Sequence, residues 1–422
     1  MKSAGSALIR SIVAIVGMAL ILTAYPMDPQ QAFAADEVKE VKVGVVFPLS
    51  GAPARNGNLM VQGIKAAMGW VNDNGGIKSL GGAKLVPVVA DTGVTVEGVA
   101  NATDRVCRDP DVKIVLGSWA SSYTMASTEI TERLGIPQFS ISYSDALTER
   151  GFKWGFYFSP PSTTQADIGL STVLKLGRDA GQDIKTAMFL GDNQAASKSF
   201  FAACEQRLPG MGVKVIGQET WSMGTLTDAT PAIQKVKTLH PDIVIFSATT
   251  IAECQMLLMK KKELQLKIPF VANGAWIADP SFQPIGAESL EGTITICAYF
   301  PNKVTPQEWL DRSLAQCARE YSKEPYVSET LGYPWVTVPV IAEVLERAGS
   351  TDPEAIRKAA HELDIHDVIS TSYFPKQGIA FDETGRIAPK YRDVTLVQWQ
   401  GGVPKTVYPP QVAVAKPVWV YK

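Results

Sequence analysis

The chain has 422 residues, of which 46% are hydrophobic and 19% are charged, a composition typical of globular proteins. A chain of this length is long enough for two domains of ordinary size. Its formal net charge of −2 at pH 7 argues against a nucleic-acid partner, because phosphate binding needs a basic face. One basic run, Lys260-Lys261-Lys262, falls in a helical pattern, and we expect it to form a solvated face.

Residues 1–34 have the pattern of a secretory signal peptide. Lys2 and Arg10 accompany an apolar run from Ile12 to Ala24, and the small residues around Ala34 provide a cleavage site. The run is too short to span a bilayer comfortably, so an uncleaved anchor is the less favoured alternative. The segment contains no Cys, which argues against a lipid anchor. We therefore expect an exported protein that is not inserted in the membrane.

Five cysteines follow this segment: Cys107, Cys204, Cys254, Cys297 and Cys317. They are too few for the disulfide framework of a small secreted scaffold, and none has C-x-x-C spacing. Most of them lie in apolar strand or helix patterns. We expect buried thiols, and the pairing stays open.

From Val41 onward, short apolar runs alternate with amphipathic helical patterns. Such alternation is typical of a parallel sheet with helices on both faces. A first series predicts strands at 42–48, 84–90, 112–118 and 136–142, with helices at 58–74, 96–109 and 124–135. A second series predicts strands at 185–191, 213–221, 241–248 and 268–274, with helices through Phe200 and Cys204 and at 232–239 and 253–264. Two such series indicate two α/β lobes rather than one large sheet.

The last third of the chain has a different pattern. It predicts a strand at 290–301, then helices at 306–322, 327–348 and 352–363. Two hairpins are expected after these helices, at 378–386 and 393–410, and Gly401-Gly402 forms the turn of the second. The tail after Pro409 is expected to run over the surface.

An enzyme needs a reactive constellation, and we find none in the sequence. His361 and His366 are spaced i, i+5, which separates them by roughly 140° around a helix, whereas a zinc-binding helix needs i, i+4. His240 falls at a helix-to-strand turn and is expected to be structural. The chain has neither a G-x-S-x-G elbow nor a G-x-G-x-x-G fingerprint. We expect no catalytic residue, metal or cofactor, although an exported α/β enzyme stays an alternative because distant residues can form an active site.

Three segments carry a resemblance to one family. They are VKVGVVFPLSGAPARNG with the nearby GIKAAMGWVNDNGGI, GSWASSYTMASTEITERLGIPQFSISYSDALTERG, and TLHPDIVIFSATTIAECQMLLMKKKEL. In order and spacing they resemble the type I periplasmic binding proteins of ABC transporters, in the group related to the branched-chain amino-acid receptors. The resemblance extends from about Val41 to Ala348.

The resemblance implies an α/β fold of two doubly wound parallel-sheet lobes, joined by three crossover strands, with the ligand in the cleft. It places the lobe boundaries at residues 38–160 with 299–376 for lobe I, and 161–298 with 377–422 for lobe II. It places the crossings near 158–162, near the strand that ends at 301, and near 377–381. It further implies a monomeric periplasmic protein that delivers a small-molecule ligand to ABC permease and ATPase subunits. A periplasmic sensor on the same fold is the alternative.

Physical reasoning places part of the site after the third predicted strand. In an open parallel sheet, ligands bind beyond the carboxyl ends of the strands, where loops lead into helices. Ser121 and Ser122 lie there, and backbone N–H groups at a helix start can hold a carboxylate or amide oxygen. The resemblance gives Ser121 the contact with the ligand's carboxylate, and a helix cap alone is the alternative. Ile141, Ser142 and Tyr143 match a second ligand-contacting stretch, although Tyr143 could instead pack between the lobes.

The chain departs from the family pattern at four positions. Ala196 and Thr249 stand where receptors for α-amino acids usually have aromatic residues after strands of the second lobe. Ala275 stands where an acidic residue pairs with the ligand's ammonium group, and Trp276 follows it. Asn56 stands where the first loop often supplies an aromatic wall.

These departures argue against an ordinary α-amino acid as the ligand. Removing one partner of a buried ion pair costs about 3–5 kcal/mol, which corresponds to a loss in affinity of roughly 100-fold or more. Trp119, Tyr143 and Trp276 provide aromatic surface instead. We expect a small carboxylate or amide with an aromatic or aliphatic body, and a hydrophobic amino acid stays an alternative. An acidic residue elsewhere could restore the amine site, with three candidates: Asp192, Glu253 and Asp279.

Overall fold

The computed structural model describes residues 38–297, 323, 328–366 and 376–419. These residues belong to one unit, Val38–Lys422. The predicted signal peptide, the helix predicted at 306–322 and the crossing near 301 lie outside the described residues. Within the described part of the chain, no helix combines the length and the apolar character that a membrane crossing needs.

The first sheet has five parallel strands in the order β2-β1-β3-β4-β5. The strands are β1 (Glu40–Phe47), β2 (Lys84–Asp91), β3 (Val112–Gly117), β4 (Gln138–Ser140) and β5 (Gly155–Tyr157). Helices α1 (Ala54–Asp73), α2 (Val96–Cys107) and α3 (Ser121–Leu134) connect the first four. β1 and β3 are almost continuous apolar runs and are buried along most of their length, as expected for strands covered on both faces.

The second sheet has seven strands in the order β14-β13-β10-β9-β8-β6-β7. Its parallel strands are β6 (Thr186–Asp192), β7 (Lys214–Trp221), β8 (Ile243–Ser247), β9 (Phe270–Asn273) and β10 (Ile294–Cys297). β13 (Thr395–Gln400) and β14 (Val403–Tyr408) add an antiparallel hairpin to the edge. The connecting helices are α6 (Ala195–Arg207), α7 (Thr230–Leu239), α8 (Ile251–Glu263) and the short α9 (Ala287–Leu290). The predicted α/β fold with two sheets is confirmed, and the hairpin predicted at 393–410 forms part of the second.

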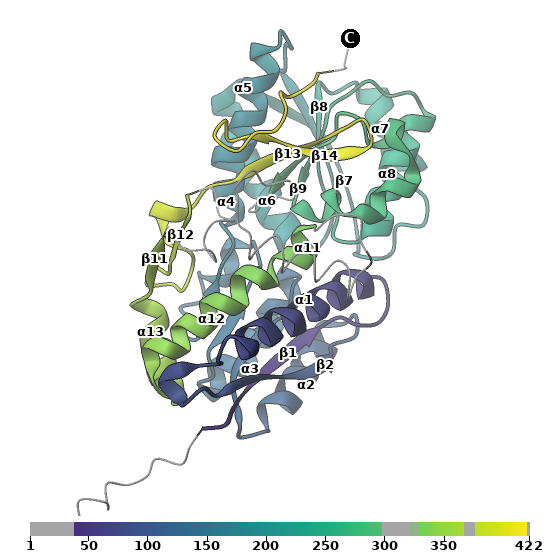
Figure 1. Ribbon diagram of the computed structural model, residues 1–422. Coiled ribbons are helices and arrows are strands. Elements are labelled where there is room, and N and C mark those ends of the chain that lie inside the picture. Colours follow the sequence, from purple (N-terminus) through teal and green to yellow (C-terminus); the bar gives the residue numbers. More distant parts are fainter. Residues whose placement is uncertain (1–37, 298–322, 324–327, 367–375, 420–422) are drawn as a thin grey trace, which may run out of the picture. The chain divides into compact units, whose positions relative to one another are not determined.

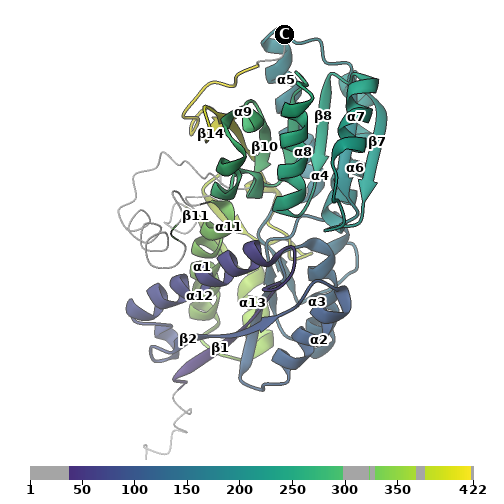
Figure 2. The same cartoon turned by 90° about the vertical axis from the view of Figure 1, so that its right-hand side faces the viewer.

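The helices of the last third pack on the first sheet's side. α11 (Glu329–Gly332) and α12 (Pro334–Ala348) pack against α1, and α13 (Pro353–His361) packs against α12 (Figure 1). Figure 2 shows α1 and α12 side by side from a second direction. A two-stranded sheet of β11 (Asp364–His366) and β12 (Gly378–Ala380) follows. α11 is therefore close to α1 in space, although the two helices are separated by more than half of the sequence.

The chain passes between the sheets after β5 and again before β13. The first passage leads through α4 (Ser162–Thr164), the π-helical η3 (Gln165–Leu170) and α5 (Ser171–Asp179) into β6, and it includes the expected crossing near 158–162.

The last passage lies later than the expected 377–381. The hairpin predicted at 378–386 still pairs with the first sheet, because Tyr157 N–H donates to the carbonyl of Gly385 at 2.8 Å and Ile387 N–H donates to the carbonyl of Tyr157 at 2.9 Å. The passage to β13 therefore follows Ile387.

The structure corrects the expectation for the basic run. Lys261 is 5% exposed, and its ammonium lies 5.0 Å from the ring centroid of Phe270. Lys261 follows Leu257 and Leu258 by four and three positions, so it shares their buried face of α8. Lys262, one position further around the helix, is exposed.

Three cysteines can be described. Cys204 and Cys254 are buried free thiols, as predicted, and Cys107 is a half-buried free thiol. Burial raises the pKa of each thiol, to about 12 for Cys107. These cysteines therefore pack as small apolar side chains.

Candidate ligand-binding site

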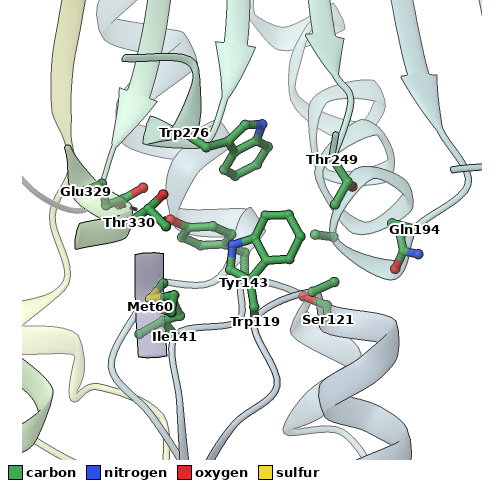
Figure 3. Close-up of a pocket in the computed structure, with 12 residues that line it drawn as sticks. Met60, Trp119, Ser121, Ile141, Tyr143, Gln194, Thr249, Trp276, Glu329 and Thr330 are labelled. Atoms are coloured by element: carbon green, nitrogen blue, oxygen red, sulfur yellow. Dashed lines mark hydrogen bonds between the residues drawn. The ribbon is translucent and has the colours of Figure 1, made fainter. Parts of the chain in front are cut away.

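A cavity lies where strands of both sheets end. It has about 470 Å³ of space free of protein atoms, including space open to solvent, so the room for a ligand is smaller. Loops after β3, β4, β6 and β8 contribute to its walls, together with α1, α11 and the short helix η5 (Ala275–Ala278). The lining residues are Met60, Trp119, Ala120, Ser121, Ile141, Tyr143, Gln194, Ala196, Thr249, Trp276, Glu329 and Thr330 (Figure 3).

A sharp turn at the end of β3 brings Trp119 to the cavity. Gly117 has a φ of +154°, and a Cβ there would lie 2.3 Å from the carbonyl oxygen of Val46, so the turn requires glycine. Trp119 has a φ of +72°, a left-handed conformation that is uncommon for a residue with a large side chain. Backbone strain of this kind persists only where the surrounding packing holds it in place, and it is often found at ligand sites.

The N-terminus of α3 meets the cavity without a side-chain cap. The N-cap residue is Ala120, so Ser121 is the first helical residue and is not a cap. Ser121 is 1% exposed, and its Oγ accepts a hydrogen bond from Ser144 N–H at 3.2 Å. The first N–H groups of a helix have no partner within the helix and carry partial positive charge. This end of the cavity is therefore suited to an acidic or amide oxygen.

Other hydroxyl groups near the turn support its conformation. Ser118 N–H donates to Thr124 Oγ1 at 3.1 Å, and Thr124 Oγ1 lies 2.7 Å from Ser142 Oγ. Ser142 Oγ donates to the carbonyl of Trp119 at 2.9 Å. Ser142 was predicted to contact the ligand, but it is absent from the cavity lining and instead holds the turn that carries Trp119.

Asp192, the last residue of β6, organises the opposite wall. Its carboxylate accepts hydrogen bonds from the N–H groups of Gln194 at 3.1 Å and Thr249 at 2.5 Å, and from Ser197 Oγ at 2.7 Å. Burial raises the pKa of this carboxyl. Gln194 and Thr249 both line the cavity, whereas Asp192 does not. Asp192 therefore positions the loops after β6 and β8 without lining the cavity itself.

Gln194 is a lining residue with a buried amide. Its side chain is only 7% exposed, and its Nε2 lies 3.2 Å from the sulfur of Met223. Its Oε1 has no hydrogen-bond partner among the described residues. A buried amide oxygen without a partner costs free energy.

Trp276 and Tyr143 form aromatic walls. Gly274 has a φ of +101°, and a Cβ there would lie 1.6 Å from the Trp276 ring, so glycine makes room for the indole. Trp276 Nε1 donates to the carbonyl of Ala248 at 3.0 Å, which fixes the ring. The centroids of Trp276 and Tyr143 are 6.3 Å apart with an interplanar angle of 37°. These side chains offer an apolar body of the ligand two ring surfaces.

Glu329 lines the cavity from α11 and was not predicted. It is 4% exposed, and its Oε1 accepts a hydrogen bond from the hydroxyl of Tyr143 at 3.1 Å. Thr330, next to it, also lines the cavity, as do Met60 and Ala120. In the sequence Glu329 is an acidic residue near the start of a predicted helix, where acids are common for electrostatic reasons alone. Nothing in that local pattern indicates a cavity.

Seven of the predicted site residues line the cavity: Trp119, Ser121, Ile141, Tyr143, Ala196, Thr249 and Trp276. The others lie around it. Ser122 Oγ accepts a hydrogen bond from Ala195 N–H at 3.0 Å, and Asn56 is buried on α1. Ala275 begins η5, directly before Trp276.

The three acidic residues that were expected to be able to restore an amine site are absent from the lining. Asp192 holds the two loops described above. Glu253 accepts hydrogen bonds from Thr250 Oγ1 at 2.8 Å and Gly224 N–H at 2.9 Å. Asp279 is paired with Arg55, with Nη2 and Oδ1 3.0 Å apart. The carboxylate at the cavity belongs to Glu329 instead.

The described residues contain no group of His, Cys, Asp and Glu that could hold a metal ion. His361 ends α13, with its ring 5.0 Å from the ring of Phe156, and His366 lies in β11. His240 has a φ of +48° and ends α7, the structural position expected for it. The arrangement of the site is that of a binding cavity between two doubly wound α/β lobes, which defines a class of ligand-binding proteins.

The family pattern described as periplasmic binding protein matches residues 40–403, and the chain belongs to this family. A Leu/Ile/Val-binding protein homolog 7 from Brucella abortus (strain 2308) is 23% identical over 404 residues, which cover 94% of this chain and 98% of that protein. A Leu/Ile/Val-binding protein homolog 8 from the same organism is 23% identical over 386 residues, which cover 89% of this chain and 92% of that protein.

Solved structures share the fold. The leucine-binding protein LivK of Thermotoga maritima MSB8 has a TM-score of 0.73 at 19% identity and covers 88% of this chain and 98% of its own. A solute-binding protein of an ABC transporter from R. palustris, in complex with benzoate, has a TM-score of 0.73 at 16% identity and covers 91% and 99%. Both likenesses establish the type I periplasmic binding protein fold for this chain.

Proposed function

We propose that the chain is an exported, non-enzymatic substrate-binding protein of an ABC importer. It binds a small organic ligand in the described cavity and delivers it to permease and ATPase subunits in the membrane. The proposal rests above all on the cavity, which combines an uncapped helix N-terminus, aromatic walls and loops from both sheets. The relatives named as Leu/Ile/Val-binding proteins and the benzoate complex support the same class of function.

The proposed ligand carries an acidic or amide oxygen on an apolar body. Ser121 and the first N–H groups of α3 hold the oxygen, and Trp119, Tyr143 and Trp276 surround the body. Aromatic and aliphatic carboxylates or amides fit this description, and a branched-chain amino acid is the alternative. A ligand that contacts both walls stabilises the closed arrangement differentially, which makes closure a population shift.

The export of the protein is part of this proposal. The pattern of residues 1–34 supports cleavage of a signal peptide and release into the periplasm. Fractionation of cells that express the full chain, with mass determination of the periplasmic product, tests this step. A product that retains residues 1–34 and stays with the membrane would contradict it.

Titration with a ligand panel tests the binding function. The panel contains leucine, isoleucine, benzoate, 4-methylvalerate and the corresponding amides, and the readout is tryptophan fluorescence together with thermal melting. A ligand at 100 times its Kd adds about 2.7 kcal/mol of stability, which gives a clear melting shift. Detection of catalytic turnover, or loss of binding only when a residue far from the cavity is changed, would refute the proposal.

A further inference from the structure

We propose that the cavity is built for a ligand whose cationic nitrogen and acidic oxygen lie at opposite ends of the molecule, with Glu329 receiving the nitrogen. The inference rests on the proposed function and names the ligand class more narrowly. Such a ligand differs from a plain carboxylate, which has no cation, and from an α-amino acid, which carries both groups on one carbon.

The two polar ends of the cavity lie apart. In Figure 3, Glu329 and Thr330 lie on one side of the cavity, and Ser121, Thr249 and Gln194 lie on the other. The rings of Trp119, Trp276 and Tyr143 lie between the two groups. A ligand that meets both ends must therefore span the aromatic section with its own body.

Glu329 gives one end its acidic character. It is 4% exposed and is the acidic residue among the described residues that line the cavity. A carboxylate has two oxygens with about four acceptor positions, so it can accept a bond from the Tyr143 hydroxyl and others at the same time. A cationic N–H group that donates to a carboxylate makes a charge-assisted hydrogen bond, which is about twice as strong as a neutral one.

The aromatic side chains favour the same kind of group. Tyr143 donates to Glu329 and also packs near Trp276, with ring centroids 6.3 Å apart, so the acid and the ring faces are adjacent. A cation near the face of Trp or Tyr is attracted by the ring quadrupole, more strongly where water is excluded. Carboxylate and rings therefore act together on a positive group.

The opposite end accepts the acid or amide group. α3 begins there without a side-chain cap, and Gln194 contributes a buried amide with its Oε1 unpartnered among the described residues. The oxygen and nitrogen of a glutamine amide can exchange places by a rotation, so Gln194 can donate to a carboxylate or accept from an amide. The unpartnered amide is an observation independent of the helix end.

The test compares four probes by isothermal titration calorimetry at pH 7.5 on the mature chain. 4-(Aminomethyl)benzoate carries both groups at opposite ends, 4-methylbenzoate lacks the cation, 4-methylbenzylamine lacks the acid, and leucine carries both groups on one carbon. We expect 4-(aminomethyl)benzoate to bind most tightly, by roughly 10- to 100-fold over 4-methylbenzoate, the range for a charged hydrogen bond.

A variant locates the effect. E329Q keeps the size of the side chain and removes its charge, so it should weaken 4-(aminomethyl)benzoate by about the same factor and leave 4-methylbenzoate unchanged. E343Q is the matched control, because Glu343 lies on α12 in an exposed pair with Arg347. It should change neither affinity. Melting of each variant without ligand shows whether it is folded.

The outcomes are distinct. If 4-methylbenzoate or leucine binds as tightly as 4-(aminomethyl)benzoate in the wild-type chain, the inference is wrong while the proposed function stands. Equal weakening of both benzoates by E329Q would also overturn it, because the effect would then be structural. If neither these probes nor the panel of the proposed function bind, the proposed function itself fails. The wild-type comparison decides the matter even where E329Q does not fold.

Discussion

Arg386 holds the loop that carries Tyr143, and its removal should lower both stability and affinity. The guanidinium is buried, with Arg386 1% exposed. Nη1 donates to the carbonyl of Ser142 at 2.6 Å, and Nη2 donates to the carbonyl of Ser144 at 2.7 Å. These two carbonyls flank Tyr143, so one cation from the hairpin after β12 fixes a wall of the cavity.

The magnitude follows from these bonds. A hydrogen bond to a charged group contributes about 1.5–3 kcal/mol net, so the two short bonds give about 3–6 kcal/mol. The cost of burying the cation opposes this, since burial lowers the pKa of Arg386 to about 10. Arg386→Met leaves two buried carbonyls without these donors and removes the guanidinium from the Tyr157 ring, 4.6 Å away. We expect a net loss of about 2–4 kcal/mol in the free energy of unfolding.

Urea unfolding followed by tryptophan fluorescence measures the change. R386K should retain one of the two bonds and fall between the wild type and R386M, because a lysine ammonium cannot reproduce the fork of the guanidinium. R108M is the control, since the side chain of Arg108 is 79% exposed in a helical pair with Asp104, and it should change stability by less than about 0.5 kcal/mol. Below its melting temperature, R386M should also bind the ligand at least about tenfold more weakly. The reasoning is refuted if R386M unfolds at the wild-type urea concentration.

Three further changes follow from other parts of the structure. K261M should stabilise the protein by about 1–3 kcal/mol at pH 7, because burial lowers the pKa of Lys261 from 10.5 to about 8. Between these two pH values the unfolded state binds more protons than the folded state, so the stability of the wild type should rise with pH relative to that of K261M. Parallel profiles of stability against pH would contradict this. G274A should abolish binding in a titration, since the new Cβ collides with Trp276; unchanged affinity would show that this indole is no wall of the site. D192N places an amide N–H donor where the carboxylate accepts from the N–H of Thr249. The free energy of unfolding in urea should fall by about 1–3 kcal/mol, and ligand binding should weaken. Wild-type stability and affinity would show that Asp192 does not position these loops.

Much of the fold could be predicted because buried parallel strands leave a strong pattern. The runs at β1, β3, β6 and β8 are apolar almost throughout, and their spacing from amphipathic helices admits few arrangements. β5 was missed because it has only three residues, and its pairing depends on β4 rather than on its own pattern. The helical segment after β5 follows two prolines and includes a π-helical stretch, so its apolar period is irregular.

The topology predicted from the sequence was enough to locate the site. It was not enough to predict which side chains point into the cavity. Ser121 and Ser122 are neighbours on a helix, separated by about 100°; Ser121 lines the cavity, whereas Ser122 Oγ accepts a hydrogen bond from Ala195 N–H. Ile141 and Tyr143 line the cavity, whereas Ser142 between them points to the Thr124 hydroxyl, as alternation in an extended segment requires. The resemblance implies ligand contacts for all three, whereas the cavity lining includes Ile141 and Tyr143.

Glu329 lines the cavity but was not predicted as a site residue. The family pattern looks for the ammonium partner after β9, where this chain has Ala275. A cavity enclosed by several elements can receive a carboxylate from any of them, and here α11 supplies it from the segment that packs on α1. The electrostatic requirement concerns the position of charge in space, not its position along the chain. Under the proposed binding mode, an acid on α11 instead of at Ala275 moves the ligand's cation to the end of the cavity opposite Ser121, and this position sets the shape of a ligand that meets both ends.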